Sequence, residues 1–408
     1  MKTFFFKKNH RTGSASIALL LFVSLFLSGC NFPSGKNAKN NPQESISGNS
    51  TSNQSASLVG QTTTQPDYLV IPLTTGAVSP ISACTYDLLH TVCTIQLYDS
   101  TDYTILNECF ALINKYEKLF SRTLETSELY RINQASARAA SSKDQEKNSE
   151  GSLTGTAYEI SPELKDILEF SLRFSDLSDG SLDVSIAPLS SLWDFSNLEH
   201  KTKAPASEDI QKAKALVNYK DITLSGNTLT FAKDGMQLEL GAVAKGYIAD
   251  RVKDFLLSKG VNSALINLGG NILLVGEKPD GTAFNVGIQK PFEDRDAVVV
   301  AISQLKDCSM VSSGIYERYF YDTDGTFYHH ILNAKTGYPC DTGLLQVTII
   351  SKDSATGDAL STACFALGLE KGMELIHSLP DVYAVFITSD GTLHFSDGFL
   401  ETIPTQTE

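Results

Sequence analysis

The chain has 408 residues, of which 42% are hydrophobic, and this is enough apolar material for one large domain or two smaller ones. Its formal net charge is -14. That acidic balance excludes proteins that bind nucleic acid through a basic surface, because such binding depends on lysine and arginine side chains that neutralise phosphates.

The first 29 residues have the pattern of a bacterial lipoprotein signal. A basic head precedes an apolar run over residues 17–27, and small residues then lead into Cys30. The run fits an export signal and falls short of the ~20 residues of a membrane-spanning helix, which disfavours a short membrane anchor. The pattern predicts that residues 1–29 are removed, that Cys30 is lipidated, and that the protein is extracytoplasmic and lipid-anchored to the bacterial cell membrane.

Residues 30–66 are rich in Ser, Asn, Thr, Gln and Gly and contain few aromatic residues. Such a segment cannot bury enough apolar surface to offset the entropy of ordering, so it is predicted to be a disordered tether. Residues 67–403 are expected to fold. The cysteines of this part form no Cys-x-x-Cys pair, which disfavours a zinc site, and most stand in apolar surroundings typical of buried thiols.

The first half of the folded part has helical patterns. Apolar residues with helical spacing predict a helix over residues 104–120. A second helix is expected to begin after Ser161, because serine is a good N-cap and Pro162 suits the first turn. A third helix is expected to begin at Ser207.

After residue 220 the pattern changes to short alternating runs, which predict hairpin strands over residues 221–231 and 236–240. A helix over residues 242–259 should end at Gly260. The remaining predicted elements are strands at 264–267, 272–275, 284–288, 298–302, 327–332 and 345–351, helices at 358–369 and 372–379, and strands at 382–387 and 393–395. Helices and strands that mix without strict alternation indicate an α+β fold.

Two oxygen donors, Asp358 and Thr362, stand four residues apart in a predicted helix. This spacing places them on one helix face. One carboxylate and one hydroxyl are too few for a calcium cage but suit magnesium, which also takes phosphate and water oxygens. From these two residues alone a simpler interpretation remains, in which Asp358 only favours the positive end of the helix and Thr362 packs inside.

Small residues surround Lys245 in the segment Gly241 to Gly246, between a predicted strand and a predicted helix. Backbone amides at a helix start can bind phosphate, and Lys245 would add a positive charge. The spacing is not that of a P-loop. The Gly269-Gly270 pair permits close backbone approach, but a bulge would explain it as well.

Several motifs follow one another in a characteristic order: Ser121 with Ser127-Glu128 and Asn133; Asp183 to Trp193-Asp194-Phe195; Gly241-Ala-Val-Ala-Lys-Gly-Tyr with Asp250; Asn267-Leu-Gly-Gly; Ser312-Ser-Gly-Ile-Tyr316; His330-Ile-Leu-Asn-Ala-Lys-Thr-Gly-Tyr-Pro; and Gly357-Asp-Ala-Leu-Ser-Thr-Ala. This series resembles the ApbE family of FAD:protein FMN transferases. The resemblance extends from about Thr91 to the end of the predicted fold.

The resemblance implies an α+β fold of mixed sheets with flanking helices, in one large two-lobed domain. It also implies a magnesium-dependent enzyme that splits FAD, attaches FMN through a phosphoester bond to a Thr or Ser hydroxyl of an exported acceptor protein, and releases AMP. Two alternatives remain open. One is an FAD pyrophosphatase that uses water as the acceptor, and the other is a non-catalytic flavin-binding lipoprotein.

The resemblance also assigns site residues. Magnesium is expected on the side chains of Asp358 and Thr362 and the backbone carbonyl of Ala242. Contacts with FAD are expected at Glu239, Lys245, Ser181, Leu182, Asp183, Leu332 and His330. The catalytic residues are expected to be Asp358 and His330, the candidate base. Strand alternation should point the neighbouring His329 the other way, in a structural role.

The sequence departs from the family pattern at several positions: Val92-Cys93-Thr94 in place of Met-Gly-Thr, Thr123 in place of a frequent tyrosine, Ser312-Ser313-Gly314-Ile315 in place of Thr-Ser-Gly-Asp, Asn333-Ala334 in place of Asp-Pro, and Glu239 in place of aspartate. The departures at Val92, Thr123 and Ile315 put individual flavin contacts in doubt. None touches the expected magnesium ligands. The chain contains no segment of the type expected in acceptors, so it is not expected to flavinylate itself.

Overall fold

The computed structural model describes residues 68–74, 79–143, 156–196, 198, 201–294 and 296–407. The predicted signal peptide, Cys30 and the predicted tether lie outside the described residues. Contacts group Gln65–Glu408 into one compact unit. Within the described ranges, no helix combines the length and apolar character needed to span a bilayer.

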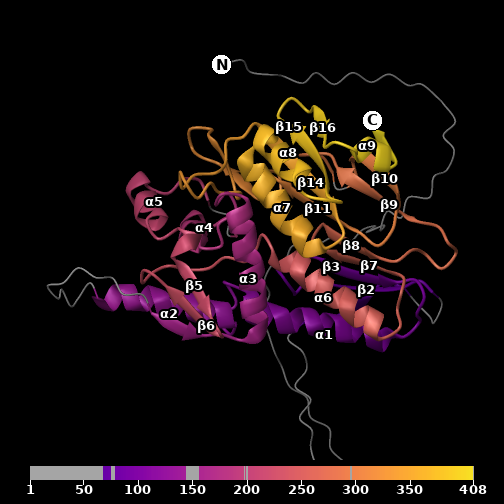
Figure 1. The fold of residues 1–408 in the computed structure, drawn as a ribbon, viewed down its shortest axis with the longest axis horizontal. Helices are drawn as coiled ribbons and strands as arrows, with labels where there is room; N and C mark the ends of the chain where they lie inside the picture. Colours follow the sequence, from indigo (N-terminus) through magenta and orange to yellow (C-terminus); the bar gives the residue numbers. More distant parts are fainter. Residues whose placement is uncertain are drawn as a thin grey trace, which may run out of the picture. The chain divides into compact units, whose positions relative to one another are not determined.

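Among the described residues of this unit, the main element is an antiparallel sheet of nine strands (Figure 1). Its strand order is β1-β2-β3-β7-β8-β11-β14-β15-β16, and every pair of neighbours is antiparallel. The strands are β1 (Ile71–Pro72), β2 (Ile81–Thr85), β3 (Cys93–Leu97), β7 (Ala264–Leu268), β8 (Asn271–Val275), β11 (Ser309–Gly314), β14 (Leu344–Ser351), β15 (Tyr383–Thr388) and β16 (Leu393–Phe395).

Smaller sheets have the orders β17-β10-β9, β4-β6-β5 and β12-β13. Their strands are β4 (Ala157–Glu159), β5 (Ile222–Ser225), β6 (Thr228–Phe231), β9 (Phe284–Gln289), β10 (Val298–Leu305), β12 (Tyr319–Tyr321), β13 (Phe327–His329) and β17 (Thr405–Thr407). The mixture of such sheets with helices confirms the α+β prediction.

The helices are α1 (Tyr103–Phe120), α2 (Glu128–Lys143), α3 (Pro162–Leu177), α4 (Ala187–Trp193), α5 (Ser207–Lys214), α6 (Ala244–Ser258), α7 (Ser354–Leu367), α8 (Leu369–His377) and α9 (Phe399–Thr402), with a 3-10 turn η1 (Tyr219–Asp221). Helix α3 begins as predicted: the Ser161 hydroxyl accepts a hydrogen bond from the Leu164 amide at 3.2 Å, and Pro162 occupies the first turn.

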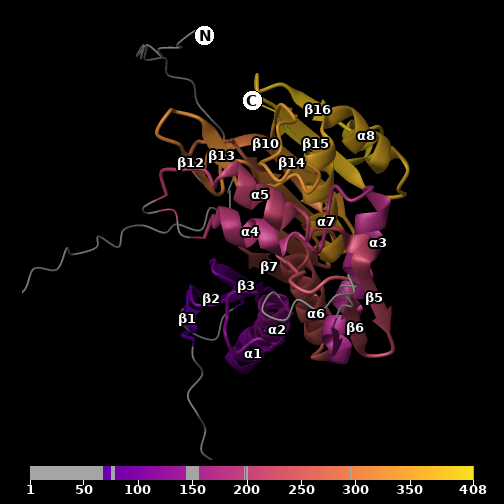
Figure 2. The ribbon, with the colours of Figure 1, turned by 90° about the vertical axis from the view of Figure 1, so that its left-hand side faces the viewer.

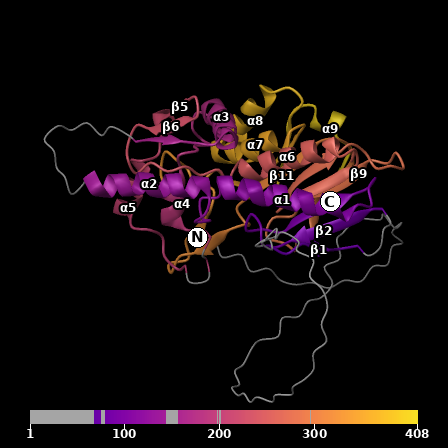
Figure 3. The ribbon, with the colours of Figure 1, turned by 90° about the horizontal axis from the view of Figure 1, so that it is seen from below.

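Strand alternation divides the core between the two faces of the large sheet. Ile349 and Phe386 pack with α7 and α8, whereas Ile350 and Val385 pack with the sheet that contains β9 and β10. Successive side chains of a strand point to opposite faces, so one pair of strands supplies both cores. Figures 1 and 3 show α1, α6 and α7 together on one side of the sheet, where their apolar residues share a cluster with β3 and β7.

A separate cluster surrounds Trp193, the sole tryptophan. It joins α4 and α5 to the β12–β13 hairpin, and Figure 2 shows these elements beside one another. The indole Nε1 of Trp193 donates a hydrogen bond to the Gly337 carbonyl at 2.8 Å. The turn that follows His330 is thereby attached to the α4 helix.

The predicted strand over residues 236–240 is wrong. Only Gln237 forms a bridge, an isolated parallel one to Ile186. Met236, Leu238 and Leu240 are buried, which explains the alternating pattern. The side chain of Asn133 takes the place of a partner strand, because its amide donates to the Leu238 carbonyl and accepts from the Leu238 amide, both at 2.8 Å.

Several predicted boundaries also shift. The helix expected over residues 242–259 is α6 and begins at Ala244, and the one expected at 372–379 is α8, Leu369–His377. The strand expected over 327–332 ends at His329. The helix expected at 358–369 begins at Ser354, so Asp358 lies in its second turn. This position contradicts the simpler interpretation of Asp358 as a charge in the first helical turn.

The six cysteines of the described part are free thiols, and all except Cys308 are buried. This confirms the expectation of buried thiols for most of them. The Gly269-Gly270 pair forms the turn between β7 and β8, with φ values of +65° and +92°. Two left-handed residues in a two-residue hairpin turn account for these glycines without any ligand.

Candidate active site

Asp358 is a buried carboxylate between two helices, with an exposed fraction of 3%. Its Oδ2 accepts a hydrogen bond from the Gly246 amide of α6 at 2.9 Å. Its Oδ1 lies 3.6 Å from Nζ of Lys245. A buried charge requires such partners, because its loss of hydration is otherwise very costly.

Lys245 connects this carboxylate to the turn before α6. Its Nζ also lies 3.3 Å from the Gly241 carbonyl, and its side chain is part-exposed. Ala242 follows Gly241 in that turn and is half-buried. The structure therefore brings together Lys245, Asp358 and the segment that contains Ala242, which the sequence analysis had placed in one site.

Thr362 lies one helical turn after Asp358 on α7, as the spacing predicted. Its hydroxyl is 3.2 Å from the hydroxyl of Ser313 on β11, and Ser313 is 2.8 Å from the hydroxyl of Ser361. Thr362 is half-buried. The residue thus has a polar partner for its hydroxyl and is only partly buried, unlike a threonine that only fills the core.

The donors around Asp358 suit a hard cation. Oδ1 of Asp358 has a 3.6 Å ion pair with Lys245, which is longer than a hydrogen bond, so it retains lone pairs for a ligand. In the part of the chain that the structure describes, no three His, Cys, Asp or Glu side chains form a metal-binding group. A cation at Asp358 would therefore complete its shell with hydroxyl, carbonyl, water or phosphate oxygens, which is the chemistry that magnesium prefers.

Most amides at the start of α6 are already used within the protein. The Gly241 amide donates to Oε1 of Glu239 at 2.9 Å, and the Ala244 amide donates to the Leu240 carbonyl at 2.7 Å. The Gly246 amide is bound to Asp358. Phosphate binding at this turn would consequently depend more on Lys245 than on the backbone amides proposed from the sequence.

Glu239 is held by a cation that sequence reasoning did not identify. Oε2 of Glu239 is paired with Nε of Arg122, and Nη1 of Arg122 lies 3.4 Å from the Ser191 hydroxyl. Both ion-pair partners are about four-fifths buried. Arg122 directly follows the motif residue Ser121, but nothing in that pattern indicated which carboxylate it would meet.

The two adjacent histidines differ in the use of their ring nitrogens. Nε2 of His329 donates to the Cys340 carbonyl at 2.9 Å, and its Nδ1 accepts from the Ile331 amide at 3.3 Å. The ring is buried, which lowers its pKa. Both nitrogens are therefore committed, and His329 has the structural role expected from strand alternation.

One ring nitrogen of His330, Nε2, makes no hydrogen bond to the residues that the structure describes. Its Nδ1 lies 3.3 Å from the Arg318 carbonyl, and a carbonyl only accepts, so Nδ1 carries the proton of the neutral ring and Nε2 keeps its lone pair. Burial lowers the pKa of His330 to about 3, with smaller contributions from the charges of Arg318 and Lys245. His330 is therefore neutral at pH 7, and its electrostatic environment includes Lys245.

The segment Ser181, Leu182, Asp183 lies next to Glu239, because the Glu239 amide donates to the Val184 carbonyl at 2.8 Å. Leu182 is buried. The Asp183 carboxylate accepts from the Ser185 amide at 2.8 Å and from the Tyr219 amide at 3.1 Å. Burial raises the pKa of Asp183. The carboxylate of Asp183 is thus used to hold its own loop. A contact between Asp183 and a flavin would therefore come from the Asp183 backbone.

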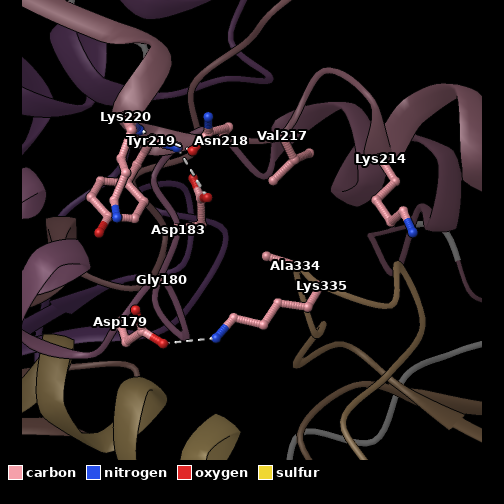
Figure 4. A pocket seen from close by; sticks show the side chains of 10 residues that line it. All are labelled: Asp179, Gly180, Asp183, Lys214, Val217, Asn218, Tyr219, Lys220, Ala334 and Lys335. Carbon is pink, nitrogen blue, oxygen red and sulfur yellow. Dashed lines mark hydrogen bonds and ion pairs between the residues drawn. The ribbon is translucent and has the colours of Figure 1, made fainter.

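A cavity of about 440 Å³ lies between this loop and the turn after His330 (Figure 4). Its lining residues are Asp179, Gly180, Asp183, Lys214, Val217, Asn218, Tyr219, Lys220, Ala334 and Lys335. Lys335 and Asp179 form an ion pair at 3.0 Å across it. Leu332 is buried in the Trp193 cluster. Of the residues that the sequence analysis assigned to FAD, the lining includes only Asp183, whereas Ala334 and Lys335 belong to the turn after His330. Lys214, Tyr219 and Lys220 are lining residues that no sequence motif indicated.

Comparisons with known proteins agree with this arrangement. The family model described as "ApbE family" matches residues 89–387. An FAD:protein FMN transferase of Klebsiella pneumoniae (strain 342) is 35% identical over 298 residues, which cover 72% of this chain and 85% of the relative. One of Treponema pallidum (strain Nichols) is 31% identical over 337 residues, covering 78% and 87% of the two chains.

Solved structures show the same fold. The flavin transferase ApbE from Vibrio cholerae superposes with a TM-score of 0.66 at 25% identity and covers 82% of this chain and 99% of that structure. The apo form of the flavinyl transferase ApbE from Pseudomonas stutzeri has a TM-score of 0.64 at 25% identity, covering 82% and 96%. Motif order, fold and these matches lead to one conclusion: the chain belongs to the ApbE family.

Proposed function

We propose that the protein is a magnesium-dependent FAD:protein FMN transferase. In this reaction the oxygen of a Thr or Ser hydroxyl on an acceptor protein forms a bond to the phosphorus of the FMN part of FAD. The bond between that phosphorus and the oxygen of AMP breaks, and AMP leaves. The observation that carries the proposal is the buried Asp358 carboxylate. Its Oδ1 lies beside Lys245 at 3.6 Å, which is too long for a hydrogen bond, and so has lone pairs available for a ligand.

Three groups of this chain would hold magnesium: the Asp358 carboxylate, the Thr362 hydroxyl and the Ala242 carbonyl. When bound, the ion would neutralise charge on the pyrophosphate. Lys245 adds a second positive charge at the same place. Positioning and charge neutralisation are the main requirements of phosphoryl-group transfer, and these residues meet both.

His330 would accept the proton of the acceptor hydroxyl. The ring is neutral at pH 7, and Nε2 is the nitrogen with the lone pair. A pyrophosphate bound near Lys245 would raise the proton affinity of the ring, because its negative charge opposes the effect of Lys245 and Arg318. FAD contacts are proposed at Glu239, Leu332 and the backbone of the Ser181–Asp183 segment, next to the cavity of Figure 4.

A labelling experiment tests this proposal. The full chain in detergent is incubated with FAD, magnesium and a peptide that carries an acceptor threonine, and the peptide mass is measured. The expected result is one added FMN per peptide and one AMP per FMN, with no product when EDTA is present. A peptide with valine in place of the threonine is the matched control. Free FMN and AMP with an unmodified peptide would instead indicate a pyrophosphatase, and FAD binding without any product would indicate a flavin-binding protein.

We further propose that the protein is extracytoplasmic and anchored through lipid on Cys30. The support is the sequence pattern of residues 1–30. A diacylated cysteine supplies the two chains that stable anchoring needs. Cys30→Ala should release the protein from the membrane fraction or leave the signal uncleaved. Normal processing with unchanged membrane retention would contradict the lipid anchor.

A further inference from the structure

Helices α6 and α7 exchange hydrogen bonds in both directions. The Gly246 amide of α6 donates to Oδ2 of Asp358 on α7 at 2.9 Å. In return, Asp250 of α6 accepts from two amides of α7: Oδ1 from Ser354 at 2.8 Å and Oδ2 from Ala355 at 2.9 Å. Each helix thus supplies one carboxylate to the backbone of the other.

Asp250 supplies the N-terminal cap that α7 lacks in its own sequence. The residue at the cap position, Asp353, makes no side-chain hydrogen bond to the helix amides. The first amides of a helix need acceptors, and a negative charge there is favourable. Asp250 meets both needs from a different helix, and its two bonds define where α7 begins relative to α6.

The backbones of the two helices are in direct contact near these bonds. A Cβ added to Gly246 would lie 2.2 Å from the Ser354 carbonyl oxygen and 2.7 Å from Cα of Ala355. This contact sets the distance between the helices, but it does not by itself set the rotation of α7 about its axis. The paired bonds to Asp250 restrict that rotation, and Asp358 is one turn further along the same helix.

We propose that Asp250 is a positioning residue that fixes the rotation and register of α7, so that Asp358 faces Lys245 and the magnesium ligands keep their places. This inference rests on the proposed function, in which Asp358 binds the metal. Asp250 does not touch the reacting atoms and acts through α7.

Asp250 has an unusual charge environment for a carboxylate. Burial and the nearby Asp353 raise its pKa to about 6, while the two amides and Arg251 oppose the rise. As the pH falls through about 6, the folded protein binds a proton on Asp250, whereas an unfolded carboxyl binds it only near ~4. From this group, acidification between these pH values therefore increases folding stability. The same proton converts one acceptor oxygen into a hydroxyl and weakens the attachment of α7.

Activity and stability should consequently change in opposite directions, which a purely structural cap would not produce. The test compares the wild type with Asp250→Asn. Asparagine has nearly the same shape as aspartate, but its side chain has only one acceptor oxygen, and its NH₂ group would face one of the two α7 amides. We expect kcat to fall and the Mn²⁺ dissociation constant, measured by electron paramagnetic resonance, to rise by about 10-fold or more, as for other residues that orient metal ligands. The KM for FAD should change little, and the midpoint of thermal unfolding should stay close to wild type.

The pH profile of kcat provides a second measurement. Wild-type kcat should decrease as the pH falls through about 6 without loss of thermal stability, and Asp250→Asn should lack this decrease. The matched control is Asp102→Asn, which makes the same substitution at the N-cap of α1. There the Asp102 side chain accepts a hydrogen bond from the Thr104 amide at 2.8 Å, and the oxygen of an asparagine can still accept it. That variant should leave kcat and Mn²⁺ affinity unchanged.

The inference would be overturned if Asp250→Asn had the same kcat and Mn²⁺ affinity as the wild type. It would also be overturned if the pH profile of kcat were the same in Asp250→Asn as in the wild type. An activity loss that merely parallels a loss of folded protein would do the same. Asp358→Asn, measured in parallel, separates the two proposals. If that variant retains transfer and Mn²⁺ binding, the proposed function fails at its metal ligand. If it is inactive while Asp250→Asn behaves as wild type, only the role of Asp250 fails.

Discussion

The contact between α6 and α7 and the cavity beside the Asp179–Asp183 loop contain the same kinds of residues in opposite arrangements. At the helix contact, Asp358 and Asp250 are bonded to backbone amides, and Gly246 allows the chains to touch. At the cavity, the side chains of Lys335 and Asp179 are exposed and are paired only with each other among the hydrogen bonds and ion pairs of the described residues. Surface pairs of this type contribute little to stability.

This difference leads us to expect different roles for the two regions, one in turnover and one in binding. Charged groups fixed by backbone bonds need no reorganisation when a ligand arrives, and this is the property that electrostatic catalysis requires. An open cavity lined by solvent-accessible lysines can admit a large ligand but does not define an orientation. We therefore expect substitutions at the helix contact to affect turnover, and substitutions at the cavity to affect mainly binding.

The largest effect is expected for Asp358→Ala. The variant loses the only carboxylate proposed as a metal ligand, and metal stabilisation worth several kcal/mol corresponds to about 10³-fold in rate. The measurement is FMN transfer to an acceptor peptide over a range of magnesium concentrations, with circular dichroism as a check of folding. Full transfer by Asp358→Ala at ordinary magnesium concentrations would show that Asp358 is not a metal ligand. The proposed difference between the two regions would then be wrong.

His330→Ala should lower kcat by about 10²–10⁴-fold, the range for loss of a general base. FAD affinity should change much less, since proton transfer belongs to the chemical step.

His329→Ala is the matched comparison and should retain most of its activity. It leaves the Cys340 carbonyl without its 2.9 Å partner, so a stability loss of about 1–3 kcal/mol is expected in denaturant unfolding. If His329→Ala abolished transfer and His330→Ala did not, the proton acceptor would have to be sought elsewhere.

Gly246→Ala tests the helix contact directly. The added methyl group would meet backbone atoms of Ser354 and Ala355 that cannot move aside independently. Overpacking of this kind costs about 1–3 kcal/mol, and we expect a lower unfolding midpoint together with weaker Mn²⁺ binding. Gly226→Ala is the control, because its φ of +59° strains an alanine while no atom lies within 4 Å of its Cβ position, so it should lower stability without a clash between helices. Equal Mn²⁺ affinity in both variants would show that the helix spacing is unimportant for the metal.

The smallest effect is expected for Lys335→Ala in the cavity. Its ion pair with Asp179 is exposed, so stability should change by less than about 1 kcal/mol. The kcat should remain near wild type, and the KM for FAD should rise by no more than a few-fold. Isothermal titration with FAD and steady-state kinetics measure both quantities. A large loss of kcat here would contradict the division between turnover and binding.

Much of the fold was predictable because its elements have strong local patterns. The Ser161 cap, the hairpin of β5 and β6 and the spacing of Asp358 and Thr362 all depend on neighbouring residues. The failures involve partners far away in sequence. Residues 236–240 alternate like a strand, but the side chain of Asn133 replaces the second strand.

The candidate site shows the same limit. Motif order indicated Glu239, Lys245 and Asp358 one by one, yet no local pattern indicates that Arg122 pairs with Glu239 or that Asp250 caps α7. Such pairings follow from which helices pack together. Periodicity reveals the apolar face of a helix but does not identify the element that covers it.

The Arg122–Glu239, Asn133–Leu238 and Gly246–Asp358 bonds span 117, 105 and 112 residues of chain. Closing loops of this length precedes any gain from the contacts, so folds rich in them form slowly. Helix α7 lies in the last quarter of the polypeptide, so a ribosome must finish nearly the whole chain before Asp358 can meet Lys245. Premature termination anywhere upstream of α7 would therefore yield a fragment without Asp358 and Thr362, the two proposed side-chain ligands of the metal, however well its earlier helices fold.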